Sequence, residues 1–224
     1  MIILFWDIDG TLLTTGKAGV PAWETAVRET TGREFQLSSI RIAGLTDYQI
    51  AVRTFEMLGL PPDDSTLRDM VRRYEDLLPQ TLPLRQGHVM PHVREILDDV
   101  SARPDVRSYL LTGNTRGGAR AKLTYYDLFK YFPDGAFAED LGDRPSIAAR
   151  AVELARRAGP LQDERLFVIG DTPHDVHAAN AIGARTIAVA TGGYSIEELE
   201  AHNPWRTLPE LPDPRAFDAL LDQE

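Results

Sequence analysis

Short apolar runs rich in β-branched or aromatic residues alternate along this chain with longer segments of helical period. The runs predict buried parallel strands at residues 2–6, 108–111, 166–169 and 186–189. The longer segments predict helices at residues 115–128, 146–158 and 173–182, with Gly183 as the C-terminal cap of the last one. Repeated strand–helix units imply right-handed crossovers, so we expect an α/β fold with a doubly wound, Rossmann-like parallel sheet.

Residues 16–84 interrupt this rhythm, because they show helical patterns and no convincing buried strand. Thr46 and Gln49 form a predicted capping box that opens a helix towards Leu58. A second helix is expected to start after the pair Pro61-Pro62 and to run to Leu78. We therefore expect a helical cap domain at 16–84, inserted into a catalytic core of residues 1–15 and 85–224. Packing of these helices on the sheet as one continuous domain is the alternative.

Composition narrows the possible functions. The 224 residues are 43% hydrophobic and 26% charged, which is ordinary for a globular protein. A formal charge of −10 argues against binding to nucleic acid or to an anionic membrane. The absence of Cys excludes disulfides, thiolate metal sites and cysteine nucleophiles. The first apolar run is too short for a leader or a membrane span. We expect a cytoplasmic protein, since a chain without Cys suits a reducing compartment, and a monomer or homodimer.

Two carboxylates follow the first predicted strand. Alternation places Asp7 and Asp9 on one side of the chain as it leaves the sheet, and Gly10 permits a sharp turn there. Ligands of open α/β sheets bind at the carboxyl ends of the strands. An isolated Asp-Gly pair would merely suggest a turn, but Asp-x-Asp-Gly-Thr directly after a buried strand favours carboxylates that take part in a functional site.

Two further strands end in polar groups. The second strand leads into Thr112-Gly113-Asn114, and the third leads into Gly170-Asp171 with Asp175 close behind. Each group has a structural alternative: Asn114 could be an N-cap, and Asp175 suits the first turn of a helix. Those alternatives do not explain why three strand ends carry such groups in this order.

With these motifs in this order, the chain resembles the haloacid dehalogenase superfamily, and specifically its phosphoglycolate-phosphatase-like branch, which has a helical cap after the first strand. The resemblance covers nearly the whole length. It is carried by Asp7-Ile8-Asp9-Gly10-Thr11-Leu12, Thr112, Arg144-Pro145, and Gly170-Asp171 with Asp175.

The resemblance implies that Asp7 is a nucleophile that becomes an aspartyl phosphate and that Asp9 is the general acid and base. It also implies a Mg²⁺ ion held by the Asp7 carboxylate, the Asp9 backbone carbonyl and Asp171, with Asp175 binding directly or through water.

The resemblance also implies that the Thr112 hydroxyl and the Gly113 N–H bind phosphate. The family usually adds the positive charge of a lysine for this purpose, and this chain has Arg144 at the corresponding position. Lys122 is the fallback for that charge, although a solvated helical lysine is the simpler interpretation.

Other chemistries of the superfamily fit less well. Its dehalogenases lack the second carboxylate that Asp9 supplies. Members that form a Schiff base use a cap lysine, whereas the amino-terminal half of this chain has only Lys17, at the expected hinge. The scattered histidines suggest no zinc site, and Gly192-Gly193 is interpreted as a simple loop before a capping box at Ser195 and Glu198.

We therefore expect a Mg²⁺-dependent phosphatase acting on a small phosphorylated metabolite, such as a phosphoglycolate-like compound or a sugar phosphate. A phosphomutase and a catalytically silent binding protein on the same fold remain alternatives. In the predicted cap, residues 44–47 are expected to face the site, with Thr46 and Asp47 as substrate-binding candidates. Alternatively, Thr46 only caps its helix.

Overall fold

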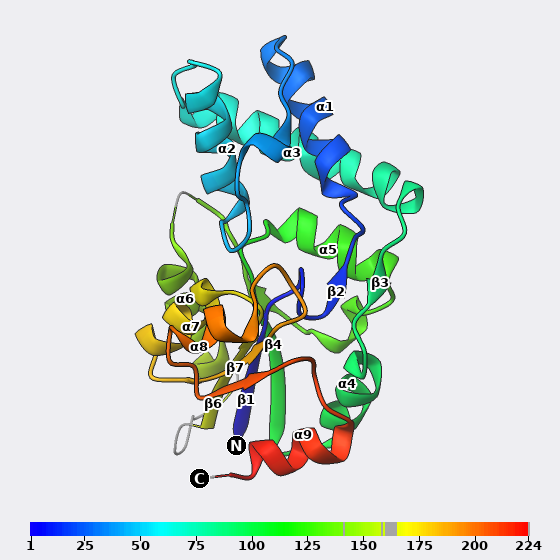
Figure 1. Cartoon of the computed structure of the whole chain (residues 1–224), viewed down its shortest axis with the longest axis vertical. Coiled ribbons are helices and arrows are strands. Elements are labelled where there is room, and N and C mark those ends of the chain that lie inside the picture. The colour runs from blue at the N-terminus through cyan, green and yellow to red at the C-terminus, as the bar shows by residue number, and fades with distance from the viewer. Residues whose placement is uncertain (141, 158, 160–164, 224) are drawn as a thin grey trace.

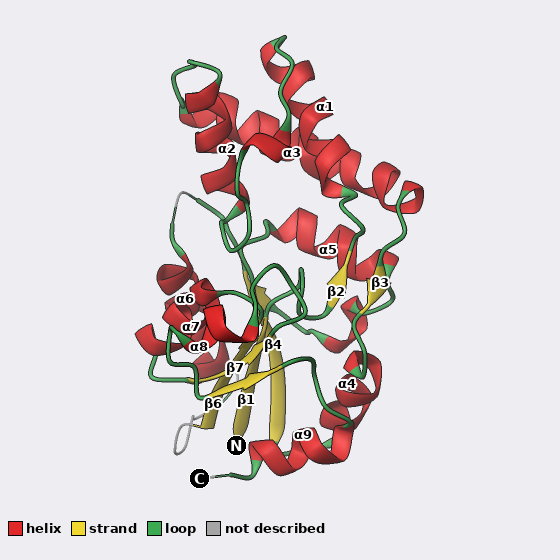
Figure 2. Ribbon diagram, viewed as in Figure 1, coloured by secondary structure: helices red, strands yellow, loops and turns green. Residues whose placement is uncertain are grey.

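The chain folds around a six-stranded sheet in the order β5-β4-β1-β6-β7-β8 (Figures 1 and 2). All neighbouring strands in this sheet pair in parallel. This computed structural model describes residues 1–140, 142–157, 159 and 165–223. The sheet strands are β1 (Ile2–Trp6), β4 (Val106–Leu111), β5 (Gly135–Ala136), β6 (Arg165–Gly170), β7 (Arg185–Val189) and β8 (Arg206–Leu208). The predicted parallel α/β fold is confirmed.

Strand β1 occupies the centre of the sheet, between β4 and β6. Every residue of β1 is buried, as expected for a parallel strand covered on both faces. Trp6 lies opposite Leu110 of β4 and Ile169 of β6, so the three strands end at the same level. The residues that follow these strands are therefore brought to one edge.

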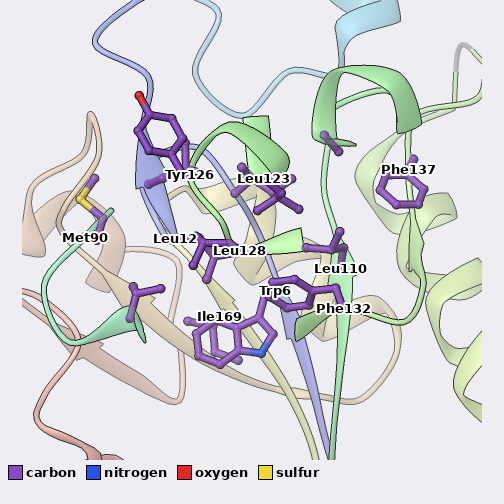
Figure 3. Packing of buried hydrophobic residues seen from close by; sticks show 14 of the residues in the cluster. Trp6, Leu12, Met90, Leu110, Leu123, Tyr126, Leu128, Phe132, Phe137 and Ile169 are labelled. Carbon is purple, nitrogen blue, oxygen red and sulfur yellow. The ribbon is translucent and has the colours of Figure 1, made fainter. Parts of the chain in front are cut away.

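Helices cover both faces of the sheet because alternate residues of each strand point to opposite sides. On one face, Trp6 and its neighbours pack against α4 (Val93–Ala102), α5 (Arg116–Tyr125) and α9 (Pro214–Leu221). Figure 3 shows part of this cluster, with Trp6 between Ile169 and Phe132. On the other face, Ile3 and Phe5 pack against α6 (Arg144–Arg157) and α7 (Pro173–Ala181).

Residues 16–84 form a group of helices beyond the carboxyl ends of the strands (Figure 1). Three α-helices, α1 (Gly19–Thr31), α2 (Asp47–Met57) and α3 (Asp64–Thr81), pack together there. Trp23 and Tyr74 make an edge-to-face contact between α1 and α3, with ring centroids 5.0 Å apart. The chain enters and leaves this group through the short antiparallel pair β2 (Leu13–Thr14) and β3 (His88–Val89). The helical content expected for 16–84 is confirmed, whereas the division into two domains at these boundaries stays a prediction.

Local sequence signals placed several helix ends correctly. The capping box at Thr46 and Gln49 opens α2, and the one at Ser195 and Glu198 opens α8 (Ile196–Glu200). Gly183 has a φ of +68°, the left-handed conformation expected after the end of α7.

Other boundaries differ from the expectation. Helix α5 ends at Tyr125 rather than 128, because Asp127 takes a positive φ of 53° that terminates the helix. Helix α6 begins at Arg144, two residues earlier than predicted, and its predicted last residue, Ala158, lies outside the described residues. None of the helices that the structure describes has both the length and the apolar character to cross a membrane.

Candidate active site

The turn after β1 places two carboxylates at the edge of the sheet. The Asp7 N–H donates to the carbonyl of Ile169 at 2.9 Å, which extends the sheet by one residue and fixes the start of the turn. Gly10 has a φ of +87°, and a Cβ there would come within 2.4 Å of Asp171 Oδ2. Only glycine suits both requirements. Asp7 is buried, and Asp9 is half-buried.

The end of β6 supplies two more carboxylates. Asp171 follows the strand directly, and the Thr11 hydroxyl donates to its Oδ1 at 3.4 Å. Asp175 lies in the first turn of α7, as expected, where its Oδ2 accepts from the N–H and the hydroxyl of Thr172 at 3.1 and 2.8 Å. Its other oxygen, Oδ1, is buried and accepts no hydrogen bond.

Asp7, Asp171 and Asp175 form an acidic cluster. One carboxylate oxygen from each lies within 4.8 Å of the other two, and all three residues are buried. Burial, followed by the charges of Asp7 and Asp175, raises the pKa of Asp171 well above its usual range. Burial also raises the pKa of Asp175 to about 6, although the neighbouring Arg144 opposes the shift. The cluster therefore holds more negative charge than its own partners neutralise.

Arg144 is the cation of this cluster. Its Nη2 lies 3.1 Å from Asp7 Oδ2 and 3.1 Å from Asp175 Oδ1, and its Nη1 donates to the carbonyl of Leu111 at 3.2 Å. Burial alone would lower the pKa of the guanidinium, but Asp175 and Asp7 raise it instead. The side chain is 4% exposed, so Arg144 is a buried cation.

The cluster fits a divalent cation on the evidence of its own atoms. Three carboxylates face one guanidinium, the Oδ1 of Asp175 has no hydrogen bond, and the donors are all hard oxygens. Hard, doubly charged ions prefer such ligands. Asp7 and Asp171 also line the adjoining cavity, whereas Asp175 does not.

The end of β4 carries a polar network that joins Asp9. Asn114 donates through Nδ2 to Asp9 Oδ2 at 2.9 Å and to the Thr112 hydroxyl at 2.8 Å. Thr115, not Asn114, caps α5. The N-cap interpretation of Asn114 is therefore wrong, because its amide is used to position Asp9 and Thr112.

Lys122 completes this network. Its Nζ lies 2.5 Å from Asp9 Oδ2 and 2.6 Å from Asn114 Oδ1, and the side chain is 7% exposed. Burial lowers the pKa of the ammonium, but Asp9, Tyr74 and Asp47 together more than offset this, and the net pKa is raised. The prediction of a solvated helical lysine is wrong. Lys122 belongs to the buried stripe of α5 with Gly118 and Ala119, a periodicity that the sequence already contains.

A cavity of about 320 Å³ lies between the strand ends and the helices of residues 16–84. Several predicted site residues line it: Asp7, Asp9, Asp47, Gly113, Arg144 and Asp171. Thr112, Thr46 and Asp175 are buried beside it without lining it. The cavity is also lined by Lys122, which was named only as a fallback, and by Asn114, which was weighed as an N-cap. Gly192 and Gly193, interpreted as a simple loop, line it as well.

The loop at Gly192-Gly193 is more than a simple connection. A Cβ on Gly192 would come within 1.6 Å of Asp171 Oδ2, so the backbone passes directly over that carboxylate. The Thr191 hydroxyl donates to the carbonyl of Gly10 at 2.5 Å, which ties the loop to the first turn. Extending the strand-end rule to β7 would have found this loop.

The loop at residues 44–47 contacts the end of β4. The Asp47 N–H donates to the carbonyl of Gly113 at 2.9 Å, and Asp47 Oδ2 accepts from the N–H of Thr115 at 2.8 Å. A Cβ on Gly113 would lie 2.9 Å from the carbonyl oxygen of Leu45, so this approach favours glycine. Thr46 is fully buried and caps α2, in agreement with the alternative interpretation.

Fold and site together define an α/β protein with a parallel sheet whose carboxylates gather beside a cavity at the strand ends. A family profile described as "Haloacid dehalogenase-like hydrolase" matches residues 3–189. The match spans most of the sequence, and the chain belongs to this family. Members of the family generally use a divalent metal, and the acidic cluster is consistent with one.

Individual relatives are more distant. The chain is 27% identical to "Probable phosphatase IndB" of Dickeya dadantii over 203 residues, which cover 90% of this chain and 86% of that protein. Among solved structures, a "predicted phosphatase from Clostridium acetobutylicum" superimposes with a TM-score of 0.75 at 17% identity, covering 99% of both chains. "CbbY from Rhodobacter sphaeroides in complex with phosphate" gives a TM-score of 0.74 at 16% identity, covering 94% of this chain and 95% of that one. At these identities the structural matches establish the fold.

Proposed function

We propose that this hydrolase is a Mg²⁺-dependent phosphatase of small phosphate monoesters and that Asp7 is its nucleophile. The observation that carries the proposal is the position of Asp7 at the cavity wall, in contact with Arg144 and within the acidic cluster. A carboxylate beside a fixed cation and a metal-binding cluster is suited to attack a phosphorus atom whose charge is spread over its oxygens.

The proposed reaction has two displacements at phosphorus. An oxygen of Asp7 forms a bond to phosphorus while the bond to the alcohol oxygen breaks, and Asp9 protonates the departing oxygen. Asp9 then takes a proton from the water that attacks the phosphoryl group, which releases phosphate and restores the Asp7 carboxylate. Lys122 and Asn114 hold the Asp9 carboxyl in place for both proton transfers.

Phosphate oxygens would be bound by the Thr112 hydroxyl, the Gly113 N–H and Arg144. The Thr112 oxygen accepts from the side chain and the backbone N–H of Asn114, which orients the hydroxyl and leaves its proton for an acceptor. Mg²⁺ would be held by Asp7, Asp171 and the Asp9 carbonyl, with Asp175 direct or through water. When bound, it supplies positive charge for the phosphoryl oxygens.

The test compares phosphate release from p-nitrophenyl phosphate in Mg²⁺ and in EDTA, using the wild type, Asp7→Asn and Asp69→Asn. Asp69 is an exposed carboxylate and serves as the matched control. We expect release only with metal, loss of activity in Asp7→Asn with an unchanged fold, and normal activity in Asp69→Asn.

Acid quenching with labelled substrate should place covalent phosphate on the peptide that contains Asp7. A label on another residue would contradict the assignment. Isomer formation without phosphate release would favour the phosphomutase alternative, and inactivity on every monoester would favour the binding protein.

A further inference from the structure

The part of the cavity formed by residues 16–84 is apolar. Its wall there is built mainly by side chains from α1, α2 and the loop between them: Val20, Trp23, Leu37, Ile42, Leu45 and Ile50. The ring of Tyr74 from α3 adds a further surface next to Trp23. The charged groups of the catalytic end lie across the cavity from this wall, on the strand ends.

Two polar side chains on this side of the cavity, Trp23 and Asp47, already make hydrogen bonds within the protein. The indole N–H of Trp23 donates to Thr54 Oγ1 at 3.2 Å, and Asp47 accepts from the Thr115 N–H. In the described part of residues 16–84, the only cation that lines the cavity is Lys17, which is exposed at the hinge. A second anionic group or a polyol bound against this wall would lose hydration without gaining matching partners, and that loss is costly.

The size of the cavity limits what can occupy it. About 320 Å³ is at the small end of the range of roughly 300–1,000 Å³ that is typical of ligand sites. Such a volume suits a phosphate with one ring or a short branched chain. The edge-to-face arrangement of Trp23 and Tyr74 adds aromatic surface for a planar group.

We propose that the alcohol released by this enzyme carries a compact apolar or aromatic group that packs against the wall formed by Val20, Trp23, Leu37, Ile42, Leu45 and Ile50. This inference rests on the proposed phosphatase function and specifies its substrate class. It departs from the phosphoglycolate-like or sugar phosphates expected from the sequence, because both would place unpaired polar groups against that wall.

The first experiment compares alkyl phosphates that differ in the group beyond the reacting oxygen. Benzyl and cyclohexylmethyl phosphate represent the apolar class, whereas glycerol 3-phosphate and 2-phosphoglycolate represent the polar class. We expect kcat/KM for the apolar pair to be about 10- to 100-fold higher, the factor expected from burying a ring of this size. Equal values, or a preference for the polar pair, would overturn the inference. Absence of hydrolysis for all four, with p-nitrophenyl phosphate also inert, would instead refute the phosphatase itself.

A pair of variants tests whether the named wall sets the preference. Ile42 lines the cavity and is 36% exposed, whereas Met57 lies at the end of α2 and is 56% exposed, so both positions should tolerate Asn. Ile42→Asn should reduce the benzyl-to-glycerol ratio several-fold, and Met57→Asn should leave it unchanged. Equal effects of the two changes would show that the wall does not select the substrate.

Lys17→Met tests the remaining route for a polar substrate. If Lys17 pairs with a carboxylate of the substrate, the change should selectively reduce hydrolysis of 2-phosphoglycolate, and that result would contradict the apolar class. We expect the relative rates on the four phosphates to stay as in the wild type.

Discussion

Replacing Arg144 tests the site most directly, because this one side chain contacts two of the three clustered carboxylates. Arg144→Ala leaves Asp7 and Asp175 buried without a cation and removes a donor to the Leu111 carbonyl. Arg144→Lys keeps the positive charge, but one ammonium cannot reproduce the fork that reaches all three oxygens.

Two magnitudes follow from the geometry. Removing one partner of a buried ion pair costs about 3–5 kcal/mol, and for a chain of this size each kcal/mol lowers Tm by roughly 2–4 °C. Arg144→Ala should therefore lower Tm by about 6–20 °C in EDTA, and added Mg²⁺ should recover part of the loss by restoring positive charge. Its kcat should fall about 10²–10³-fold or more, as for comparable donors to a developing charge. Arg144→Lys should fall between Ala and the wild type in both measurements.

The assay combines thermal unfolding, with and without Mg²⁺, and steady-state phosphate release. Arg156→Ala is the matched control, because Arg156 lies on the same helix and pairs with Glu153 at 3.0 Å while 55% exposed. An exposed pair of this kind is worth about 0–1 kcal/mol. If Arg144→Ala resembled Arg156→Ala in Tm and in kcat/KM, both the structural and the catalytic role of Arg144 would be refuted.

Three further results are expected. Asp171→Ala should weaken Mg²⁺ affinity and activity together, with excess metal restoring part of the rate; unchanged activity at limiting metal would make Asp171 structural. Lys122→Met should lower kcat about 10-fold or more with a smaller change in KM, because Asp9 loses its ammonium partner. Lys122→Arg should recover part of the lost kcat, and a normal kcat in Lys122→Met would show that Lys122 does not position Asp9. Asp47→Asn tests the pH dependence of stability. Burial raises the pKa of Asp47 to about 6, so the free energy of unfolding of the wild type falls by up to about 3 kcal/mol as pH rises from about 4 to 6. Over that window Tm of the Asn variant minus Tm of the wild type should increase, and a constant difference would show that Asp47 titrates normally.

The sequence predicted the central architecture because its signals there are local. Apolar runs followed by polar strand ends marked β1, β4 and β6, and the capping boxes predicted at Thr46 and Ser195 are present in the structure. Short elements such as β5 and β8 were missed, since two or three residues carry too little pattern to recognise.

The predicted site was incomplete for a different reason. Asp7, Asp171 and Arg144 were named from a linear motif, and the structure brings them together. Lys122 was misjudged because the partners that hold its charge, Asp9 and Tyr74, are far apart in sequence, although the helical period already placed it on the buried face of α5.

The central position of β1 also has a consequence for how the protein folds. Its neighbours, β4 and β6, begin about 100 and 160 residues later in the chain, so its pairing is strongly non-local. At synthesis rates of about 5–20 residues per second, roughly 10–30 s pass between the synthesis of β1 and that of β6, its second partner strand. High contact order of this kind slows folding and leaves an unpaired, aggregation-prone segment on the ribosome. The strand that carries Asp7, the proposed nucleophile, is thus made early and is paired on both sides only when β6 has emerged.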